Sequence, residues 1–262
     1  RTILLENTRF WPGETRNELS LSTFFAELGD IFCNDAFSVC HRAHASVVGV
    51  ANLLPSCSGL LLEEELAALE KVLLDPLRPI VAVIGGAKIS TKLALFENLI
   101  KQVDHIVVGG GMANTFLFAQ GLEIGTSIFE IEQVNIARYI LKSAAKENCN
   151  IHLPLDLICA KELKKDAQYT THLFNECPKD KMILDAGPET IVHVASVFTD
   201  CKTLVWNGPL GAFEITPFDH ATNILAKTAA KLTSKGSLIS IAGGGDTVSA
   251  LNSKNLSKKF SY

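Results

Sequence analysis

The feature that most constrains the fold is a unit repeated from about residue 76 onward: a short apolar run, a polar or glycine-containing turn, then a helical pattern. This order is typical of βα units that build a parallel sheet. The apolar runs span residues 80–84, 106–108, 151–158, 203–206 and 238–241. Four of them lead into the turns Gly85-Gly86-Ala87-Lys88, Gly109-Gly110-Gly111, Asn207-Gly208-Pro209 and Gly243-Gly244-Gly245-Asp246. Because ligands bind at the carboxyl ends of strands in open α/β sheets, we predict that these turns face one crevice.

Two more strand candidates precede residue 60, at residues 2–5 and 30–33, and each is followed by a turn that carries an arginine. Fewer than sixty residues are too few for a self-sufficient α/β core. We therefore predict that residues 1–59 are the remainder of a domain whose beginning is absent.

A predicted helix over residues 60–74 separates this part from the rest of the chain. Its leucines Leu62, Leu66, Leu69 and Leu73 fall on one face, and Asp75-Pro76 ends it. We predict that residues 60–75 connect two domains and that residues 76–262 form the second one.

The composition limits the partners and the compartment. The 262 residues carry a formal net charge of −4, which gives no overall reason to bind nucleic acid or an anionic membrane. No apolar run reaches the ~18 residues of a membrane span. The seven cysteines are scattered without a CxxC pair, which suits reduced thiols in a cytoplasmic protein.

The turn that follows residues 80–84 is a candidate phosphate site. Glycines let the backbone approach a ligand closely, and a helix start offers free N–H groups to an anion. We predict that Lys88 and Lys92 share a face at this helix start, where a bound anion would relieve their repulsion. The alternative is a tight turn followed by solvated lysines. Neither a Walker A nor a GxGxxG pattern is present.

The turn at residues 243–247 repeats the glycines and adds Asp246 and Thr247. Successive glycine amides can cradle phosphate oxygens, and one carboxylate in such a loop can bind a magnesium ion that keeps several waters. The alternative is an N-cap aspartate after a flexible loop. Two such turns at one sheet edge favour phosphate binding.

Residues 207–214 join a rigid turn, apolar surface and the carboxylate of Glu214. We interpret them as a surface for an adenine and a ribose hydroxyl. The glycines at 109–111 are either the opposite wall of that pocket or a close packing turn.

Arg9 and Arg42 are candidates for an anion site in the first part of the chain, because the guanidinium fork bonds phosphate and carboxylate bidentately. The alternative for either residue is a surface salt bridge. His41 and His44 flank Arg42, but no cysteine ligand is arranged nearby, so we expect no metal there.

Six segments together resemble the ordered motifs of the phosphoglycerate kinase family, bacterial type, over essentially the whole chain. They are LLENTRF, NDAFSVCHRAHASVVGV, VIGGAKISTKLALFENL, VGGGMANTF, VWNGPLGAFE and AGGGDT. One departure is Ser38-Val39-Cys40, where the family usually has Gly-Thr-Ala. The resemblance also implies that the family's N-terminal segment, with its RVDFNVP and SHLGRP stretches, and its C-terminal end are lacking.

The resemblance implies two Rossmann-like parallel-sheet domains joined by an interdomain helix, with the first domain only partly present. Residues 1–59 would belong to the 3-phosphoglycerate-binding domain and residues 76–262 to the nucleotide-binding domain. The implied activity is reversible phosphoryl transfer from 1,3-bisphosphoglycerate to ADP in glycolysis and gluconeogenesis, by a monomer without nucleic-acid or membrane partners.

The resemblance also implies residue roles. Arg9 and Arg42 would hold the phosphate of 3-phosphoglycerate, and Asp246 would bind the magnesium of MgATP or MgADP. The implied catalytic residues are Lys88, Lys92 and Gly244. The implied nucleotide-binding residues are Gly86, Ala87, Lys92, Gly110, Asn207, Pro209, Glu214, Gly244, Gly245, Asp246 and Thr247.

Two other functions remain open from the sequence. A truncated chain could act only as a nucleotide-binding module, which would not need the second anion site at Arg9 and Arg42. A dinucleotide-dependent oxidoreductase is disfavoured, because it would carry a GxGxxG fingerprint.

Overall fold

The computed structural model describes residues 2–73 and 76–262, and the chain divides into two compact units, residues 1–74 and 75–262. Each unit is described by itself. No helix in the described part of the chain is both long and apolar enough to cross a membrane.

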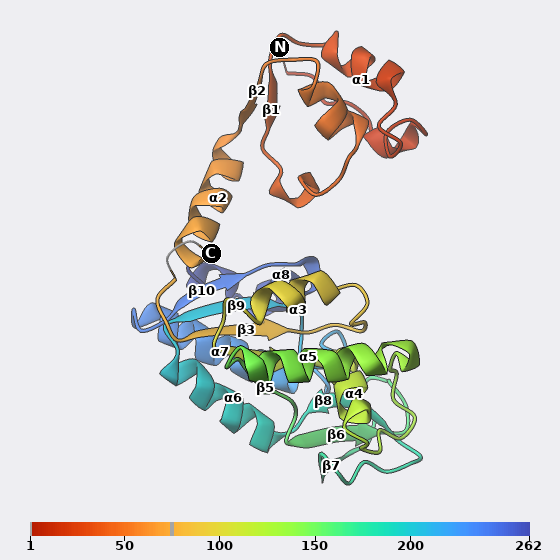
Figure 1. Ribbon diagram of the computed structural model, residues 1–262, viewed down its shortest axis with the longest axis vertical. Coiled ribbons are helices and arrows are strands. Elements are labelled where there is room, and N and C mark those ends of the chain that lie inside the picture. Colours follow the sequence, from red (N-terminus) through yellow and green to blue (C-terminus); the bar gives the residue numbers. More distant parts are fainter. Residues whose placement is uncertain (1, 74–75) are drawn as a thin grey trace. The chain divides into compact units, whose positions relative to one another are not determined.

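Unit 1 holds a short parallel strand pair and several short helices (Figure 1). Its elements are η1 (Thr8–Phe10), α1 (Leu19–Ala26), β1 (Phe32–Asn34), η2 (Phe37–Val39), the π-helical turn η3 (Ala45–Gly49), β2 (Ser56–Ser58) and α2 (Leu60–Leu73). The predicted strand at residues 30–33 is β1, shifted by two residues at its start. The predicted strand at residues 2–5 is wrong, because no described segment pairs with it and Leu4 is 96% exposed.

Helix α2 is the predicted helix, and residues 74 and 75 of the predicted connector lie outside the described residues. Its start is held by Asp35, whose carboxylate accepts a 3.0 Å hydrogen bond from the Leu62 amide. On its leucine face, Leu62 is buried and Leu66 is 42% exposed.

Unit 2 is the larger and better-packed unit. Its elements are β3 (Ile80–Ile84), α3 (Leu93–Leu99), β4 (His105–Val108), α4 (Gly110–Ala119), η4 (Ile131–Gln133), α5 (Val134–Lys146), β5 (Asn150–His152), β6 (Asp156–Ala160), β7 (Tyr169–Leu173), β8 (Met182–Ala186), α6 (Pro188–Asp200), β9 (Thr203–Asn207), α7 (His220–Ser234), β10 (Ile239–Ala242), α8 (Gly245–Ser253) and η5 (Ser257–Lys259).

The main sheet of unit 2 has the order β10-β9-β3-β4-β5, and all its strands run parallel. The chain fills one half of the sheet from β3 to β5 and then returns to fill the other half with β9 and β10. The strand order therefore reverses between β3 and β9. At such a switch point the connections leave toward opposite faces, which opens a crevice at the carboxyl ends of the two strands. The predicted parallel α/β fold is confirmed.

Both faces of this sheet are covered, because side chains alternate along each strand. On β3, Ile80, Ala82 and Ile84 pack with α3, α4 and α5. Val81 and Val83 point to the other face and pack with α6, α7 and α8. All five side chains of β3 are at most 2% exposed, which explains its unbroken run of apolar residues.

The predicted strand at 151–158 is two strands in different sheets. β5 ends at His152 and β6 begins at Asp156. Between them stands Pro154, which has no N–H to donate to a strand ladder. β6 continues in a separate antiparallel sheet of order β7-β6-β8, which lies beside the main sheet of unit 2 (Figure 1). β7 and β8 are additions that the sequence reasoning missed.

Candidate functional site

The candidate site lies at the switch point, where the turns after β3 and β9 touch through their backbones. The Gly85 amide donates a 3.0 Å hydrogen bond to the Asn207 carbonyl. A Cβ at Gly85 would overlap the Pro209 carbonyl oxygen, and a Cβ at Gly208 would overlap the Gly85 carbonyl oxygen. Gly208 also has φ +111°, which disfavours other residues. Only glycine allows the two turns to lie this close.

The turn after β4 joins them. Gly110 has φ +68°, and its amide donates a 2.8 Å hydrogen bond to the Leu210 carbonyl. The Met112 amide donates to the Gly86 carbonyl over 3.0 Å. Backbone hydrogen bonds thus hold three of the four predicted glycine turns together at one edge of the sheet.

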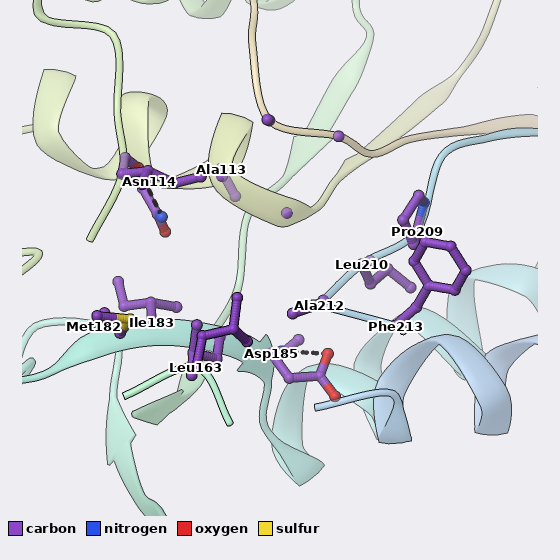
Figure 2. A pocket seen from close by; sticks show the side chains of 18 of the residues that line it. Ala113, Asn114, Leu163, Met182, Ile183, Asp185, Pro209, Leu210, Ala212 and Phe213 are labelled. Carbon is purple, nitrogen blue, oxygen red and sulfur yellow. Dashed lines mark hydrogen bonds between the residues drawn. The ribbon is translucent and has the colours of Figure 1, made fainter. Parts of the chain in front are cut away.

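An apolar cavity of about 310 Å³ opens between these turns and strand β8. Figure 2 shows three walls of the cavity. Ala113 and Asn114 of α4 form one wall, and Leu163 with Met182 and Ile183 of β8 forms the wall opposite it. Pro209 to Phe213 form the third wall. The predicted residues Gly86, Ala87, Gly110, Pro209, Glu214 and Asp246 all line it. The turn at 109–111 is therefore a wall of the same cavity as residues 209–214.

A polar cleft of about 300 Å³ adjoins the cavity and shares Gly86, Ala87 and Asp246 with it. Its other lining residues are Gly85, Thr91, Lys92, Asn207, Gly208, Gly244, Gly245 and Thr247. An apolar chamber that continues into a glycine-rich cleft with a lysine fits a ligand with a flat apolar part and an anionic tail.

The ammonium group of Lys92 is fixed in the cleft by three hydrogen bonds. It donates to the Gly85 carbonyl at 2.7 Å, the Asn207 carbonyl at 3.0 Å and Asn207 Oδ1 at 2.5 Å. These bonds use its three N–H donors. Burial lowers the pKa of Lys92, and the nearby carboxylate of Asp246 opposes part of that shift. The side chain bridges the turns after β3 and β9 and sets a positive charge at their junction.

The prediction that Lys88 and Lys92 share a helix face is wrong. α3 begins only at Leu93 with Lys92 as its N-cap residue, and Lys88 lies in the preceding turn, exposed. Glu130, 40 residues after Ser90 in the chain, holds this turn in a non-helical conformation. Its carboxylate accepts hydrogen bonds from the amide and the hydroxyl of Ser90, at 3.1 and 2.5 Å. Partial burial alone would raise the pKa of Glu130, but hydrogen bonds from Ser90 and Ile89 and the charge of Lys88 lower it.

The start of α8 forms the other side of the cleft. Gly244 is its N-cap residue and has φ +93°, a conformation suited to glycine. Thr247 is buried, and its hydroxyl accepts a 2.7 Å hydrogen bond from the Gly208 amide. That bond ties α8 to the turn after β9. By helix geometry the first amides of α8 have no acceptor within the helix and are free for an anion.

Asp246 stands exposed in the first turn of α8 and lines both the cavity and the cleft. No group of three or more His, Cys, Asp or Glu side chains suited to a metal occurs in the described residues. One carboxylate beside a cleft lined by a lysine and a helix start is compatible with magnesium, which binds through one or two carboxylates and takes its other ligands from water and ligand oxygens.

Asp185 was not predicted from the sequence, although it lies at the end of the wall formed by β8. It is buried, and its carboxylate accepts hydrogen bonds from the Ala186 amide at 2.9 Å and the Ala221 amide at 3.0 Å. Burial raises the pKa of Asp185 to about 8, although these amides favour the anion. The apolar run 182–184, closed by Gly187-Pro188, was the available sequence signal for this wall.

The two arginines of unit 1 are not brought into one cleft. Arg9 lines a cleft with Glu14 and His44, whereas Arg42 is exposed and is not among the residues that line it. Glu14 is 1% exposed and accepts a 3.0 Å hydrogen bond from the Ser46 amide. It lies 3.6 Å from His44 Nδ1.

Comparison with known proteins shows which family the chain resembles in sequence and in structure. A sequence profile described as phosphoglycerate kinase matches residues 1–262. The phosphoglycerate kinases of Dinoroseobacter shibae and Cereibacter sphaeroides (strain ATCC 17029 / ATH 2.4.9) are 55% and 56% identical over 260 residues, which are 99% of this chain and 66% of each relative.

Among solved structures, phosphoglycerate kinase from Coxiella burnetii is 45% identical, with a TM-score of 0.87 over 98% of this chain and 65% of that one. The enzyme from Pyrococcus horikoshii, 24% identical with a TM-score of 0.81, shares the fold over 97% of this chain and 65% of its own. This chain thus spans just under two thirds of the length of its relatives. Because the profile matches residues 1–262 and the Dinoroseobacter and Cereibacter relatives are more than half identical over 99% of the chain, the chain belongs to the phosphoglycerate kinase family.

Proposed function

We propose that the protein is a phosphotransferase that moves a phosphoryl group reversibly between 1,3-bisphosphoglycerate and ADP, giving 3-phosphoglycerate and ATP. The observation that carries the proposal is the apolar cavity that continues into the cleft holding Lys92 and the start of α8. Membership of the family supports the choice of phosphoglycerate as the acceptor.

The nucleotide would place its adenine in the cavity between α4, β8 and residues 209–213, with Glu214 near the ribose. Its phosphates would lie in the cleft against the amides of Gly244 and Gly245 and the charge of Lys92. Asp246 would hold a magnesium ion. When bound, that ion neutralises phosphate charge.

The acceptor is a carboxylate that is already ionised near neutral pH, so the reaction needs no general base. Catalysis then depends on positioning and on positive charge near the migrating group. We assign this charge to Lys92 and to Lys88, whose exposed side chain is free to reach a ligand. Arg9 and Arg42 would bind the phosphate of 3-phosphoglycerate on unit 1.

The domains follow from these roles: residues 1–59 for the phosphoglycerate, residues 60–75 as the connector and residues 76–262 for the nucleotide. We further propose a cytoplasmic monomer without nucleic-acid or membrane partners. The free thiol state of all seven cysteines supports a reducing compartment.

A second candidate is a chain that only binds nucleotide. It is favoured by one observation: cavity and cleft lie wholly within unit 2, whereas Arg9 and Arg42 do not line a common cleft in unit 1. Turnover of 3-phosphoglycerate with MgATP by the chain and by a full-length version separates the two candidates.

The nucleotide site is tested by calorimetric titration of this chain with ADP, with and without magnesium. Asp246→Ala should weaken the magnesium-dependent part of the affinity and spare the rest. Glu132→Ala, which removes an exposed carboxylate outside both cavities, should change neither part. Equal losses with and without magnesium would remove Asp246 from the metal site.

A further inference from the structure

Two cysteines lie in contact away from the candidate nucleotide site. The sulfur atoms of Cys159 and Cys177 are 4.0 Å apart. Cys159 sits in β6 and is 0% exposed, and Cys177 lies in the connection between β7 and β8 and is 5% exposed. Both belong to a small apolar cluster with Leu117, Ile124 and Leu157.

We propose that Cys159 and Cys177 are a reversible oxidation site, at which hydrogen peroxide converts the two thiols into an intramolecular disulfide. The inference does not depend on the proposed kinase activity, because neither cysteine lines the cavity or the cleft.

The backbone around the pair allows the bond to form. A disulfide needs the two sulfur atoms about 2.05 Å apart, so they must approach by roughly 2 Å. Cys159 is held in place, because β6 is hydrogen-bonded to β7 on one side and β8 on the other. Cys177 stands outside regular structure between the exposed residues Glu176 and Lys179, so it can make the movement. Local opening of such a surface turn also gives an oxidant access to its sulfur.

The two thiols are chemically unequal. The hydrogen bond between them raises the pKa of Cys159, and burial acts in the same direction. The same hydrogen bond lowers the pKa of Cys177. Since the thiolate is the nucleophile, Cys177 is the sulfur that reacts first. Burial raises the pKa of the Cys149 and Cys201 thiols to about 11 and about 12, so they form the thiolate less readily than Cys177 does.

The reaction balances in two steps. The Cys177 thiolate attacks one oxygen of hydrogen peroxide, the O–O bond breaks, and Cys177 becomes a sulfenic acid as hydroxide leaves and takes up a proton to form water. The sulfur of Cys159 then attacks the sulfur of Cys177, the S–O bond breaks, and a second water leaves with the proton of Cys159. Two thiols lose two electrons and one peroxide gains them. A small thiol reverses the change by exchange.

The disulfide would close a loop that contains all of β7. In the reduced chain β7 is hydrogen-bonded to β6 and has no strand partner on its outer edge among the described strands. A covalent link from β6 to the turn beyond β7 removes freedom from the unfolded chain, so oxidation should stabilise unit 2.

The test is oxidation of the folded chain with hydrogen peroxide, alkylation of remaining thiols in denaturant, and tryptic mapping by mass spectrometry. We expect peptide 147–161 linked to peptide 166–179, with the loss of two hydrogen masses and full reversal by a small thiol. Cys149 shares the first peptide with Cys159. The link should therefore persist in Cys149→Ala and vanish in Cys177→Ala and in Cys159→Ala.

Thermal unfolding followed by the fluorescence of buried Trp206 gives a second readout. Oxidation should raise the midpoint by about 5 °C or more in the wild type and in Cys149→Ala, and not in Cys177→Ala. Three results would overturn the proposal: no link between the two peptides, a link that Cys149→Ala abolishes, or oxidation of Cys177 to the sulfinic acid while Cys159 remains alkylated.

Discussion

At the scale of single residues, Lys92 shows how a structural and a chemical role can coincide. Its three hydrogen bonds join the turns after β3 and β9, so the charge is positioned before any ligand binds. A preorganised charge costs no rearrangement when negative charge develops nearby. Two backbone carbonyls and the side-chain oxygen of Asn207 hold the ammonium, so none of its three hydrogen-bond partners is a carboxylate.

We expect Lys92→Ala, in a full-length version, to lower turnover on the order of a hundredfold while 3-phosphoglycerate binding changes little. A charge that acts on the migrating group appears chiefly in the rate constant. Lys92→Arg should recover only part of the rate, because a planar fork cannot reproduce three bonds to Gly85 and Asn207. Steady-state kinetics and separate titrations check this. Normal turnover with weak phosphoglycerate binding would move Lys92 to the substrate side.

Asp185 predicts how the stability of unit 2 depends on pH. Its pKa is about 8 in the folded state and about 3.9 in an unfolded chain, so the folded state binds more protons between these values. The contribution of the Asp185 carboxyl to the free energy of unfolding is therefore fully present below about pH 4 and is lost as the pH rises through about 8. In Asp185→Asn this downward trend of the unfolding free energy should disappear, on top of a constant loss of about 1–3 kcal/mol from an unpaired backbone amide.

Denaturant unfolding at several pH values, followed by Trp206 fluorescence, measures this trend. Asp156→Asn is the matched control, because Asp156 is also buried and accepts hydrogen bonds from the amides of Glu189 and Thr190. It should lose stability, because its buried amide partners lose a carboxylate oxygen. Parallel curves for the wild type and Asp185→Asn would contradict the assignment.

At the scale of elements, the site depends on turns rather than on helices or strands. The turns after β3, β4 and β9 touch through backbone atoms at Gly85, Gly110 and Gly208, and α8 joins them through Thr247. The sheet supplies the spacing, since Ile84 of β3 lies opposite Asn207 of β9. Side chains larger than hydrogen would push the turns apart and widen the cleft.

Three glycine substitutions separate close packing from backbone strain. Gly208→Ala combines φ +111° with overlap on Gly85, so it should cost more than about 3 kcal/mol and abolish nucleotide binding. Gly236→Ala has φ +72° but no neighbour within 4 Å, so about 1–2 kcal/mol is expected. Gly243→Ala has neither feature and should be near neutral in stability. Denaturant titration ranks the three, and equal losses would show that overlap is unimportant.

At the scale of the whole molecule, the two units differ in how much apolar surface they bury. Ala45, Val50 and Leu62 are the buried apolar residues of unit 1 among those described, whereas Ile3, Leu4 and Phe10 are more than 70% exposed. Unit 2 has cores on both faces of its sheet. We expect the free energy of unfolding of unit 2 not to depend on unit 1, so the effect of a ligand on one unit can be measured separately from the other.

Removal of either Arg9 or Arg42 should weaken 3-phosphoglycerate binding about ten- to hundredfold and leave MgATP affinity unchanged. The reason is that both arginines belong to unit 1 and the proposed nucleotide site to unit 2. Arg42→Lys should recover part of the loss. The measurement is calorimetry on a full-length version with each ligand alone.

Arg16→Ala is the control, because Arg16 is an exposed arginine of the same unit that pairs with Glu18 at 3.1 Å. It should bind both ligands normally. If Arg42→Ala kept its phosphoglycerate affinity, or lost MgATP affinity to the same degree, the placement of the acceptor site would be wrong.

The sequence by itself determined the parallel α/β architecture of unit 2 and the edge of the sheet that carries the candidate site. Both follow from local chemistry: β-branched runs such as 80–84 favour strands, and glycine turns after them favour close backbone approach. Because parallel strands end at the same edge, the sequence predicted that the glycine turns face one crevice, and Gly86, Gly110, Pro209 and Glu214 line one cavity there.

Only the tertiary structure decided what these residues touch. Lys92 finds its amide partner in Asn207, 115 residues later, and the start of α3 depends on Glu130, 40 residues from Ser90. The wall formed by β8 and the contact of Cys159 with Cys177 arise from a second sheet that begins where Pro154 ends β5. Long-range pairings of this kind depend on burial and strand register, which no local pattern of residues encodes.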